Sequence, residues 1–263
     1  MAQPRIVFLM YHELELAGRA ICQSEPGYAR YVLPLADFRG QLEWLKRSGF
    51  RGFNVTQALA YPAEPSVCIT FDDGCETDLV AAAPVLRECG FDATFYVTAG
   101  RIGAEGHMNQ DQLRELRQQG FEVGCHSMTH VYLSDLDESA LKREIVEAKE
   151  RIEHILGERI AHFSCPGGRY SERALALARD AGFKTVANSE FHANDSGTDL
   201  FRLGRVAMLR DLTVDEFGQV CRGRGLWKKR LAHNARRGAQ RLLGNKNYDR
   251  VRGSVLGESH PDR

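Results

Sequence analysis

Short apolar runs alternate along the chain with longer segments in which apolar residues recur at helical spacing. The runs 5–11, 67–71 and 93–97 predict buried strands. Before Gly157, apolar residues recur every three or four positions, which predicts an amphipathic helix that the glycine ends. The alternation continues through residues 5–221 and predicts a parallel sheet with covering helices. At this length we expect a barrel rather than an open sheet.

Composition is that of a folded protein with a sizeable core. The chain has 263 residues, of which 43% are hydrophobic and 27% are charged. The apolar run 6–10 is too short for an export signal, and we find no run long enough to span a membrane. Seven scattered cysteines without a C-x-x-C pair favour reduced thiols, so we expect a cytoplasmic protein.

Charge is balanced over the whole chain but unevenly distributed along it. Formal net charge is zero, yet residues 222–252 contain eleven Lys or Arg and one acid, Asp249. On a helical projection the apolar and basic side chains of this stretch separate, which is typical of a helix on an anionic membrane. A solvated helix packed on the barrel fits equally well. We therefore divide the chain into a barrel domain, 1–221, and a basic amphipathic tail, 222–263, without an aromatic platform for nucleic acid.

Histidines, paired acids and a Pro-Gly-Gly-Arg run all follow predicted strands. The carboxyl ends of the strands in a parallel barrel meet on one face, where catalytic residues collect. The Asp-Asp-Gly sequence by itself is also ordinary turn chemistry. In a barrel, however, we expect one cluster made of residues that are far apart in sequence: His12, Asp72, Asp73, His126 and 166–169.

Two histidines four positions apart add a metal-binding pattern to this cluster. His126-Ser-Met-Thr-His130 can turn both imidazoles toward one point, and one aspartate adds a carboxylate. This set suits zinc, and also cobalt or iron, and leaves coordination positions open for water and substrate. Because a bound metal lowers the pKa of water, the second aspartate can take the water's proton. The pattern predicts metal-assisted hydrolysis of an amide or ester.

These motifs resemble those of the polysaccharide deacetylases with a NodB homology domain, carbohydrate esterase family four. The resemblance implies a distorted (β/α) barrel, usually with seven strands. It also implies a metal-dependent hydrolase, with zinc as the first choice and cobalt, nickel or iron as alternatives. Such an enzyme removes the N-acetyl group from an amino sugar of a glycan, here in bacterial surface-polysaccharide synthesis. The similarity covers residues 5–210 and rests on Thr70-Phe-Asp-Asp-Gly74, His126-Ser-Met-Thr-His130, Tyr11-His12 and 163–170.

Motif matching assigns roles to four of these residues. Asp72 would be the catalytic base, and Asp73, His126 and His130 would hold the metal. Further residues of the same motifs and strand ends are expected to contact the substrate: Tyr11, Pro166, Gly167, Arg169 and Arg205.

One arginine of the family pattern is missing. Many members carry an arginine two residues before the proline of the third motif, where this chain has Ser164. The resemblance implies that this arginine orients the base aspartate. In this chain, Arg169 or Arg205 would have to orient Asp72 instead.

A late histidine that serves many members as general acid is also missing, because residues 205–209 contain none. His12 and His192 are available, and we favour His12, as acid or substrate contact, because it follows a strand. The missing groups leave two alternatives open: a deformylase for a lipid-linked formamido sugar, and a catalytically silent glycan-binding barrel. Peripheral membrane contact through residues 222–252 would suit a lipid-linked N-acetylated saccharide as the partner.

Overall fold

The structure is a computed structural model that describes residues 5–23, 27–60 and 65–226. Its centre is a parallel sheet with the strand order β10-β1-β5-β6-β7-β8-β9, and β4 pairs with the first half of β5. A bridge from Ala187 to Leu203, just ahead of β10, joins the two edges. The predicted distorted (β/α) barrel is therefore confirmed, with β4 added to the expected seven strands. The strands are β1 (Val7–Tyr11), β4 (Arg51–Phe53), β5 (Ser66–Phe71), β6 (Thr94–Val97), β7 (Glu122–Cys125), β8 (His162–Ser164), β9 (Thr185–Ala187) and β10 (Val206–Ala207).

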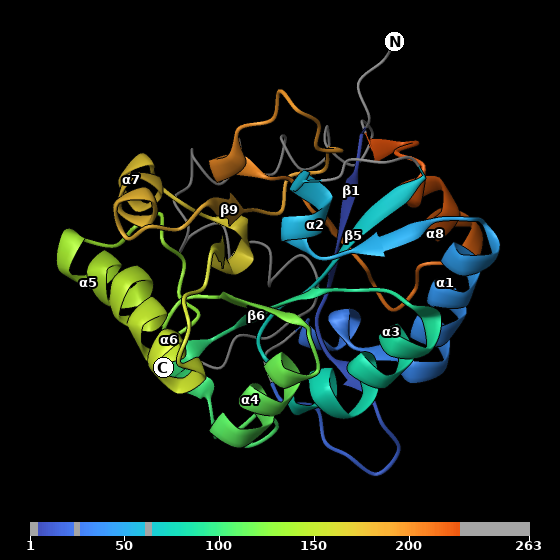
Figure 1. Ribbon diagram of the computed structural model, residues 1–263, viewed down its shortest axis with the longest axis horizontal. Coiled ribbons are helices and arrows are strands. Elements are labelled where there is room, and N and C mark those ends of the chain that lie inside the picture. The colour runs from blue at the N-terminus through green and yellow to red at the C-terminus, as the bar shows by residue number, and fades with distance from the viewer. Residues whose placement is uncertain (1–4, 24–26, 61–64, 227–263) are drawn as a thin grey trace.

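Helices follow most strands and cover the outside of the sheet (Figure 1). One group packs on one flank, where α1 contacts both α3 and α8, and a second group forms the opposite flank, where α5 contacts α7. The α-helices are α1 (Leu35–Arg47), α2 (Val55–Ala60), α3 (Ala83–Cys89), α4 (Gln110–Gln118), α5 (Glu138–Lys142), α6 (Ala148–Leu156), α7 (Glu172–Asp180) and α8 (Val214–Cys221). Short helical turns are η1 (Tyr28–Tyr31), η2 (Asp78–Ala82), η3 (Ala99–Arg101), η4 (Arg143–Glu147), η5 (Pro166–Gly168) and η6 (Leu200–Arg202), of which η2 and η4 are π-helical.

Strand alternation divides the buried side chains into two cores. Successive side chains of a strand point to opposite faces, so every second residue of β1 and β5 faces the helices. Leu9, Tyr11 and Phe71 belong to this outer core, whereas Phe8 and Cys68 belong to a smaller core inside the barrel. The inward parity of β5 continues to Asp72, which places its carboxylate inside the barrel.

A two-stranded arm holds a long loop near the carboxyl end of β5. Strands β2 (Leu14–Glu15) and β3 (Leu33–Pro34) pair in parallel, and the segment between them passes the turn that follows β5. The backbone N–H of Leu14 donates to Thr77 Oγ1 at 3.3 Å. This arm therefore fixes both ends of the loop that carries Gln23 to the acid pair.

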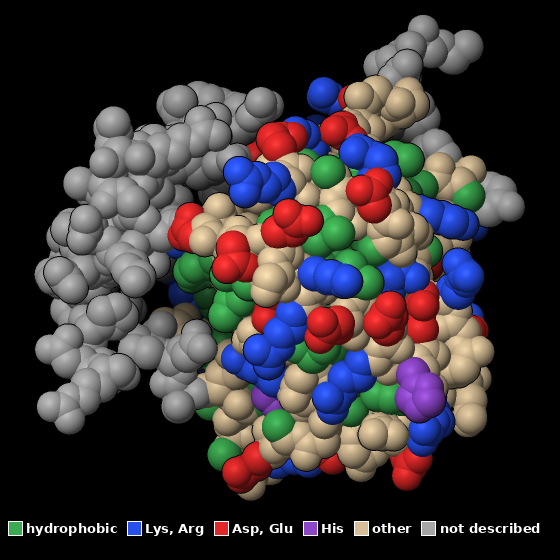
Figure 2. Space-filling model, turned by 90° about the vertical axis from the view of Figure 1, so that its left-hand side faces the viewer, with side chains coloured by type: hydrophobic (Ala, Val, Ile, Leu, Met, Phe, Trp, Pro, Cys, Tyr) green, Lys and Arg blue, Asp and Glu red, His purple; other side chains and the backbone are tan. Residues whose placement is uncertain are grey.

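Charged side chains of both signs alternate over the face shown in Figure 2. That face includes the flank of α5, α6 and α7, and no single-sign patch dominates it. Within the part of the chain that the structure describes, no helix is long and apolar enough to cross a bilayer. The basic tail predicted for 222–263 lies outside the described residues from position 227 onward.

Candidate active site

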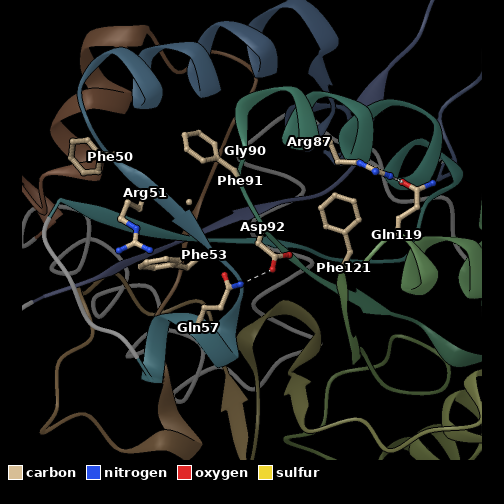
Figure 3. A pocket seen from close by; sticks show the side chains of 12 residues that line it. Phe50, Arg51, Phe53, Gln57, Arg87, Gly90, Phe91, Asp92, Gln119 and Phe121 are labelled. Carbon is tan, nitrogen blue, oxygen red and sulfur yellow. Dashed lines mark hydrogen bonds between the residues drawn. The ribbon is translucent and has the colours of Figure 1, made fainter.

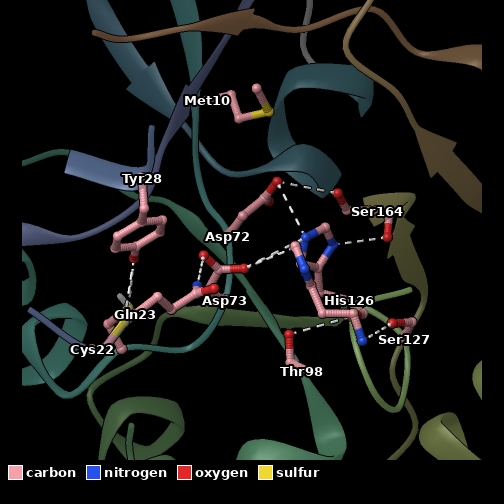
Figure 4. Close-up of polar contacts among 12 residues, drawn as sticks. Met10, Cys22, Gln23, Tyr28, Asp72, Asp73, Thr98, His126, Ser127 and Ser164 are labelled. Carbon is pink, nitrogen blue, oxygen red and sulfur yellow. Dashed lines mark hydrogen bonds and ion pairs between the residues drawn. The ribbon is translucent and has the colours of Figure 1, made fainter. Parts of the chain in front are cut away.

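The acid pair follows β5 in a tight turn at the carboxyl end of the sheet (Figure 4). The backbone N–H of Asp72 still donates to Tyr11 on β1, at 3.0 Å, and thereby extends the strand by one residue. Asp73 then has φ 80°, a left-handed backbone conformation that residues other than glycine rarely adopt. This turn directs the two carboxylates to different surroundings, although both are almost completely buried.

Asp72 is clamped by a buried arginine. Arg205 Nη1 donates to Oδ1 and Nη2 to Oδ2, each at 2.7 Å, which is the bidentate geometry of a strong charge-assisted pair. Burial alone would raise the pKa of Asp72, but the charge of Arg205 and the arginine hydrogen bonds hold that pKa below its usual value. Asp72 is therefore an anion at every physiological pH.

Arg205 comes from the segment before β10 and is fully buried. It also donates to Ser164 Oγ at 2.6 Å and to Thr70 Oγ1 at 3.2 Å. Of the two arginines expected to orient Asp72, Arg205 is the one that does so. Arg205 is also a predicted substrate contact, and its side chain is fully buried among these acceptors.

Asp73, His126 and His130 form the second part of the site. Nε2 of His130 lies 3.3 Å from Asp73 Oδ1, and Nε2 of His126 lies 3.7 Å from the same oxygen. His126 Nδ1 is 2.9 Å from the carbonyl oxygen of Ser164, so this nitrogen donates and Nε2 remains free to act as a ligand. One ligand atom from each of the three residues fits within a 4.8 Å cluster.

These three residues fit a divalent cation. Asp73 Oδ1 is buried and has no hydrogen-bond partner within the described residues, whereas Oδ2 accepts a hydrogen bond from Gln23 Nε2 at 2.7 Å. Burial and the neighbouring Asp72 raise the pKa of Asp73 to about 6, a cost that a bound cation would remove. Burial also lowers the pKa of His126 to about 3, so its imidazole is neutral, as a metal ligand must be. The donor set matches that of catalytic zinc sites.

Backbone strain is concentrated at this cluster. Among the described residues other than glycine, the positive φ values belong to Asp73, Ser127 and His130. Such conformations persist where the surrounding structure holds them, and they gather at functional sites. The turn 126–130 is held by the Glu144 carboxylate, which accepts hydrogen bonds from the backbone N–H groups of residues 128 and 129 and from the Thr129 hydroxyl, at 2.7–3.0 Å.

His12 continues the inward parity of β1 and lies level with Asp72. Its ring packs on Tyr31 with 4.7 Å between centroids, and its Nδ1 is buried without a partner among the described residues. Burial lowers the pKa of His12, while the charges of Asp73 and Asp72 oppose that shift. The other histidine considered as the acid, His192, packs on Gly204 in a loop that next pairs with β1 at Ile6. That loop runs toward the amino ends of the strands, away from the acid pair.

The third motif packs against an exposed aromatic ring. Arg169 lies over Tyr132 with 4.0 Å from Cζ to the ring centroid, and a side chain at Gly167 would come within 2.5 Å of the same ring. Tyr132 is 39% exposed and lies two residues after His130. The predicted contacts Gly167 and Arg169 thus lie beside the histidine turn, together with the buried Pro166.

The predicted substrate contact Tyr11 points away from the acid pair. Tyr11 is fully buried in the outer core, where its hydroxyl donates to Gln41 Oε1 at 2.8 Å and its ring stacks on Phe71. The last residue of β1 therefore faces the helices, and only the next residue, His12, faces the site. Strand alternation is the sequence signal that separates these two neighbours.

Sequence reasoning did not find Gln23, Glu144 or Tyr132. Gln23 lies in a loop without periodicity, and Glu144 lies on a helix where an acid is ordinarily exposed. Only Tyr132 carried a signal, because a large aromatic residue lies two positions after the histidine motif. A separate cavity of about 510 Å³, lined by residues such as Phe53 and Asp92, lies where β6 and β7 begin (Figure 3). That end of the barrel is opposite to the acid pair.

Comparisons with known proteins agree with this geometry. Residues 60–186 match the family model described as polysaccharide deacetylase. YxkH of Bacillus subtilis, named as a polysaccharide deacetylase, is 26% identical over 220 residues, which are 81% of this chain and 75% of that protein. The peptidoglycan-N-acetylglucosamine deacetylase of Bacillus cereus is 31% identical over 124 residues, 47% of this chain and 56% of that protein. The match to this second relative thus spans little more than half of its length.

Solved structures show the same fold. The Streptococcus pyogenes deacetylase PplD, in complex with acetate, aligns with a TM-score of 0.73 at 22% identity over 84% of this chain and 99% of that chain. IcaB from Ammonifex degensii aligns with a TM-score of 0.67 at 25% identity over 83% and 96% of the two chains. Family model, relatives and fold agree with the two motifs, and residues 60–186, just under half of the chain, are similar to polysaccharide deacetylases.

Proposed function

We propose that this protein is a divalent-metal-dependent hydrolase that removes the N-acetyl group from an amino sugar of a surface polysaccharide. One observation carries the proposal: an arginine-clamped carboxylate, Asp72, lies beside the Asp73, His126 and His130 cluster at the carboxyl end of the barrel. Relatives named as deacetylases of N-acetylglucosamine polymers support the choice of an N-acetyl substrate.

Asp73, His126 and His130 would hold the cation, with zinc as the first choice. A cation bound there supplies Lewis acidity, which lowers the pKa of water and polarises an amide carbonyl. Asp72 lies on the same side as the His126 ring, with Oδ2 3.7 Å from Nε2, so it can accept the proton of an attacking water. Its depressed pKa makes it a weak base, but this pKa also keeps it ionised, and Arg205 fixes the direction of its free lone pairs.

His12 is the group we assign as the proton donor to the departing amine. It lies on the strand next to that of Asp72, and its Nδ1 is otherwise unpartnered among the described residues. Burial keeps the imidazole neutral in the resting site, so the proton that Asp72 takes from the attacking water would pass to His12 before His12 gives it to the departing, more basic amine. Tyr132, whose ring packs against Arg169 and Gly167, is 39% exposed beside His130 and would offer the exposed part of its ring to a sugar.

The proposal also covers where the reaction takes place and in what form the substrate is presented. We keep a cytoplasmic location, a lipid-linked saccharide and membrane contact through residues 222–252 as parts of the hypothesis. Co-sedimentation with anionic vesicles should disappear when residues 227–263 are deleted. Vesicle binding that is equal with and without the tail, or absent from the full chain, would remove the membrane part and leave the site untouched.

Acetate release tests the proposed chemistry directly. The full chain should release acetate from one or more of chitooligosaccharide, peptidoglycan and poly-β-1,6-N-acetylglucosamine, and a chelator should stop the release until zinc is restored. Formate release from a formamido sugar, with no acetate from any N-acetyl substrate, would favour the deformylase. Binding of these glycans without any release would favour the silent barrel.

A further inference from the structure

Two cysteines meet beside the acid pair although 53 positions separate them in sequence. The sulfurs of Cys22 and Cys75 lie 2.9 Å apart, and the Tyr28 hydroxyl lies 3.3 Å from the first and 3.6 Å from the second (Figure 4). At this distance no atom fits between the two sulfurs. Cys22 is partly exposed, whereas Cys75 is fully buried.

Independent contacts fix the backbone on both sides of this sulfur pair. Cys75 forms an antiparallel bridge with His107, directly after the turn that contains the acid pair. The backbone N–H of Cys22 donates to both carboxylate oxygens of Glu13, at 3.0 Å each. Gly106 packs so tightly on Cys22 that an added Cβ would lie 2.6 Å from the cysteine Cβ. The sulfur contact is thus held by surroundings that do not depend on it.

A small reagent can reach the pair from one side. Cys22 lines a cavity of about 430 Å³ together with Arg19 and Glu105, and Cys75 lies behind it. The exposed sulfur can therefore react first and the buried sulfur second, which is the order that disulfide exchange requires.

We propose that Cys22 and Cys75 form a reversible disulfide by exchange with a low-molecular-weight disulfide. The Cys22 thiolate attacks one sulfur of the reagent, and the first small thiol leaves with the proton that Cys22 lost. Cys75 then attacks the Cys22 sulfur of the mixed disulfide, and the second small thiol leaves with the proton of Cys75. One reagent disulfide is reduced to two thiols while two cysteine thiols become one S–S bond, so atoms and electrons balance.

A cation is the competing occupant, since Glu13, Cys22 and Cys75 also form a three-donor cluster. Two thiolates on a tetrahedral zinc, at about 2.3 Å each, lie roughly 3.8 Å apart. The sulfurs here are closer than that, and both Glu13 oxygens already accept the Cys22 N–H. These contacts favour a direct bond between the sulfurs over a bridging ion.

The bond would brace the neighbouring site. Gln23, next to Cys22, donates to Asp73 Oδ2, and Asp73 lies two residues before Cys75. A disulfide would therefore tie the donor and the acceptor of this hydrogen bond to each other. The inference goes beyond the proposed function, because the bond can form whether or not the protein hydrolyses any glycan.

The test uses the full chain equilibrated in buffers of oxidised and reduced glutathione, then alkylated and digested. Mass spectrometry should find the peptides of Cys22 and Cys75 joined with the loss of two hydrogens, and the thermal midpoint of the oxidised protein should rise by about 5 °C. Cys22→Ser and Cys75→Ser should each abolish both effects. Cys89→Ser, at a partly exposed cysteine elsewhere, should change neither.

The wild-type experiment decides the matter even if a serine variant folds poorly. A glutathione adduct on Cys22 that never resolves into the joined peptides would overturn the proposal. So would a second equivalent of zinc in the reduced wild-type protein that is lost in Cys22→Ser, since that result would assign the cluster to a cation.

Discussion

At the scale of single residues, two adjacent aspartates have opposite surroundings. Asp72 points into the barrel toward Arg205, and its pKa is depressed, whereas Asp73 faces two imidazoles and its pKa is raised to about 6. A regular strand would also send the two side chains to opposite faces, but it would bury Asp73 in the outer core. The left-handed φ of Asp73 turns its carboxylate toward the histidines instead. These surroundings suit the proposed roles of Asp72 as the base and Asp73 as a metal ligand.

Arg205→Lys tests the clamp on Asp72. Lysine keeps the charge but loses the two-pronged geometry, so we expect kcat to fall by about 10²-fold while zinc content is unchanged. The weaker partner raises the pKa of Asp72, and because the ionised form is active, the acid limb of the kcat/KM profile should move to higher pH. An acid limb at the wild-type position would show that Arg205 does not act through Asp72.

Tyr132→Ala tests the exposed ring beside the histidine turn. Loss of a stacking face should raise KM by up to about tenfold and leave kcat nearly unchanged. Tyr132→Phe, which retains the ring, is the matched control and should behave like the wild type. A fall in kcat at constant KM would instead mean that the ring only supports the turn.

At the scale of elements, the turn 126–130, which carries two of the proposed metal ligands, is held by a residue of the helical turn η4. Glu144, in η4, satisfies two backbone N–H groups and one hydroxyl of the turn, where Ser127 and His130 have strained φ values. Replacing a carboxylate that accepts these hydrogen bonds should loosen the geometry of His130. The ligand set is therefore supported from a second layer of residues.

Glu144→Gln should weaken zinc binding by about 10- to 100-fold. Competition with a chromogenic chelator measures this affinity without any need for a substrate. Glu147→Gln, at an exposed position on the same helical turn, should bind zinc as the wild type does. Equal zinc affinity in both variants would contradict the supporting role of Glu144.

Sequence alone identified the proposed metal ligands but not the residues that hold them in place. Asp72, Asp73, His126 and His130 belong to short motifs, and the strand ends that carry them converge in any parallel barrel. The motif alone does not tell which way Tyr11 points, whereas the parity of β1 turns it toward the helices. The same parity argument predicts that Cys125 and His126 face opposite ways, and they do: Cys125 belongs to the outer core.

At the scale of the whole molecule, closure of the barrel brings Arg205 to Asp72 across 133 positions of sequence. The bridge from β9 to Leu203 places the segment before β10 inside the ring. Motif spacing carries no information about such a partner, so sequence left Arg169 and Arg205 as equal choices. The same limit applies to Gln23, which comes from a loop outside the repeating pattern.

At the opposite end of the barrel, the Glu122 side chain links several neighbouring segments. Its carboxylate accepts hydrogen bonds from Thr56 and Thr94 and lies 3.3 Å from His162 Nε2. Burial alone would raise the pKa of Glu122, but the contact with His162 and these hydrogen bonds hold that pKa below its usual value. The carboxylate therefore adds stability above the pKa of the unfolded chain, and this stability is lost as pH falls through the folded-state pKa.

Glu122→Gln should lower the free energy of unfolding by about 2 kcal/mol at pH 7. The difference from the wild type should shrink below about pH 4, where both side chains are neutral. Urea unfolding at a series of pH values measures it, with the exposed Glu150→Gln as control. A difference that stays constant down to pH 3 would rule out the charge of Glu122 as its cause.

The division of labour between the two aspartates is tested most directly by one paired measurement on Asp72→Asn. Zinc content and acetate release from an N-acetylglucosamine polymer are determined on the same samples as for the wild type. We predict that the variant keeps its zinc and loses acetate release by about 10²- to 10⁴-fold, because only the base has been removed. Acetate release at the wild-type rate by the zinc-loaded variant would contradict the account.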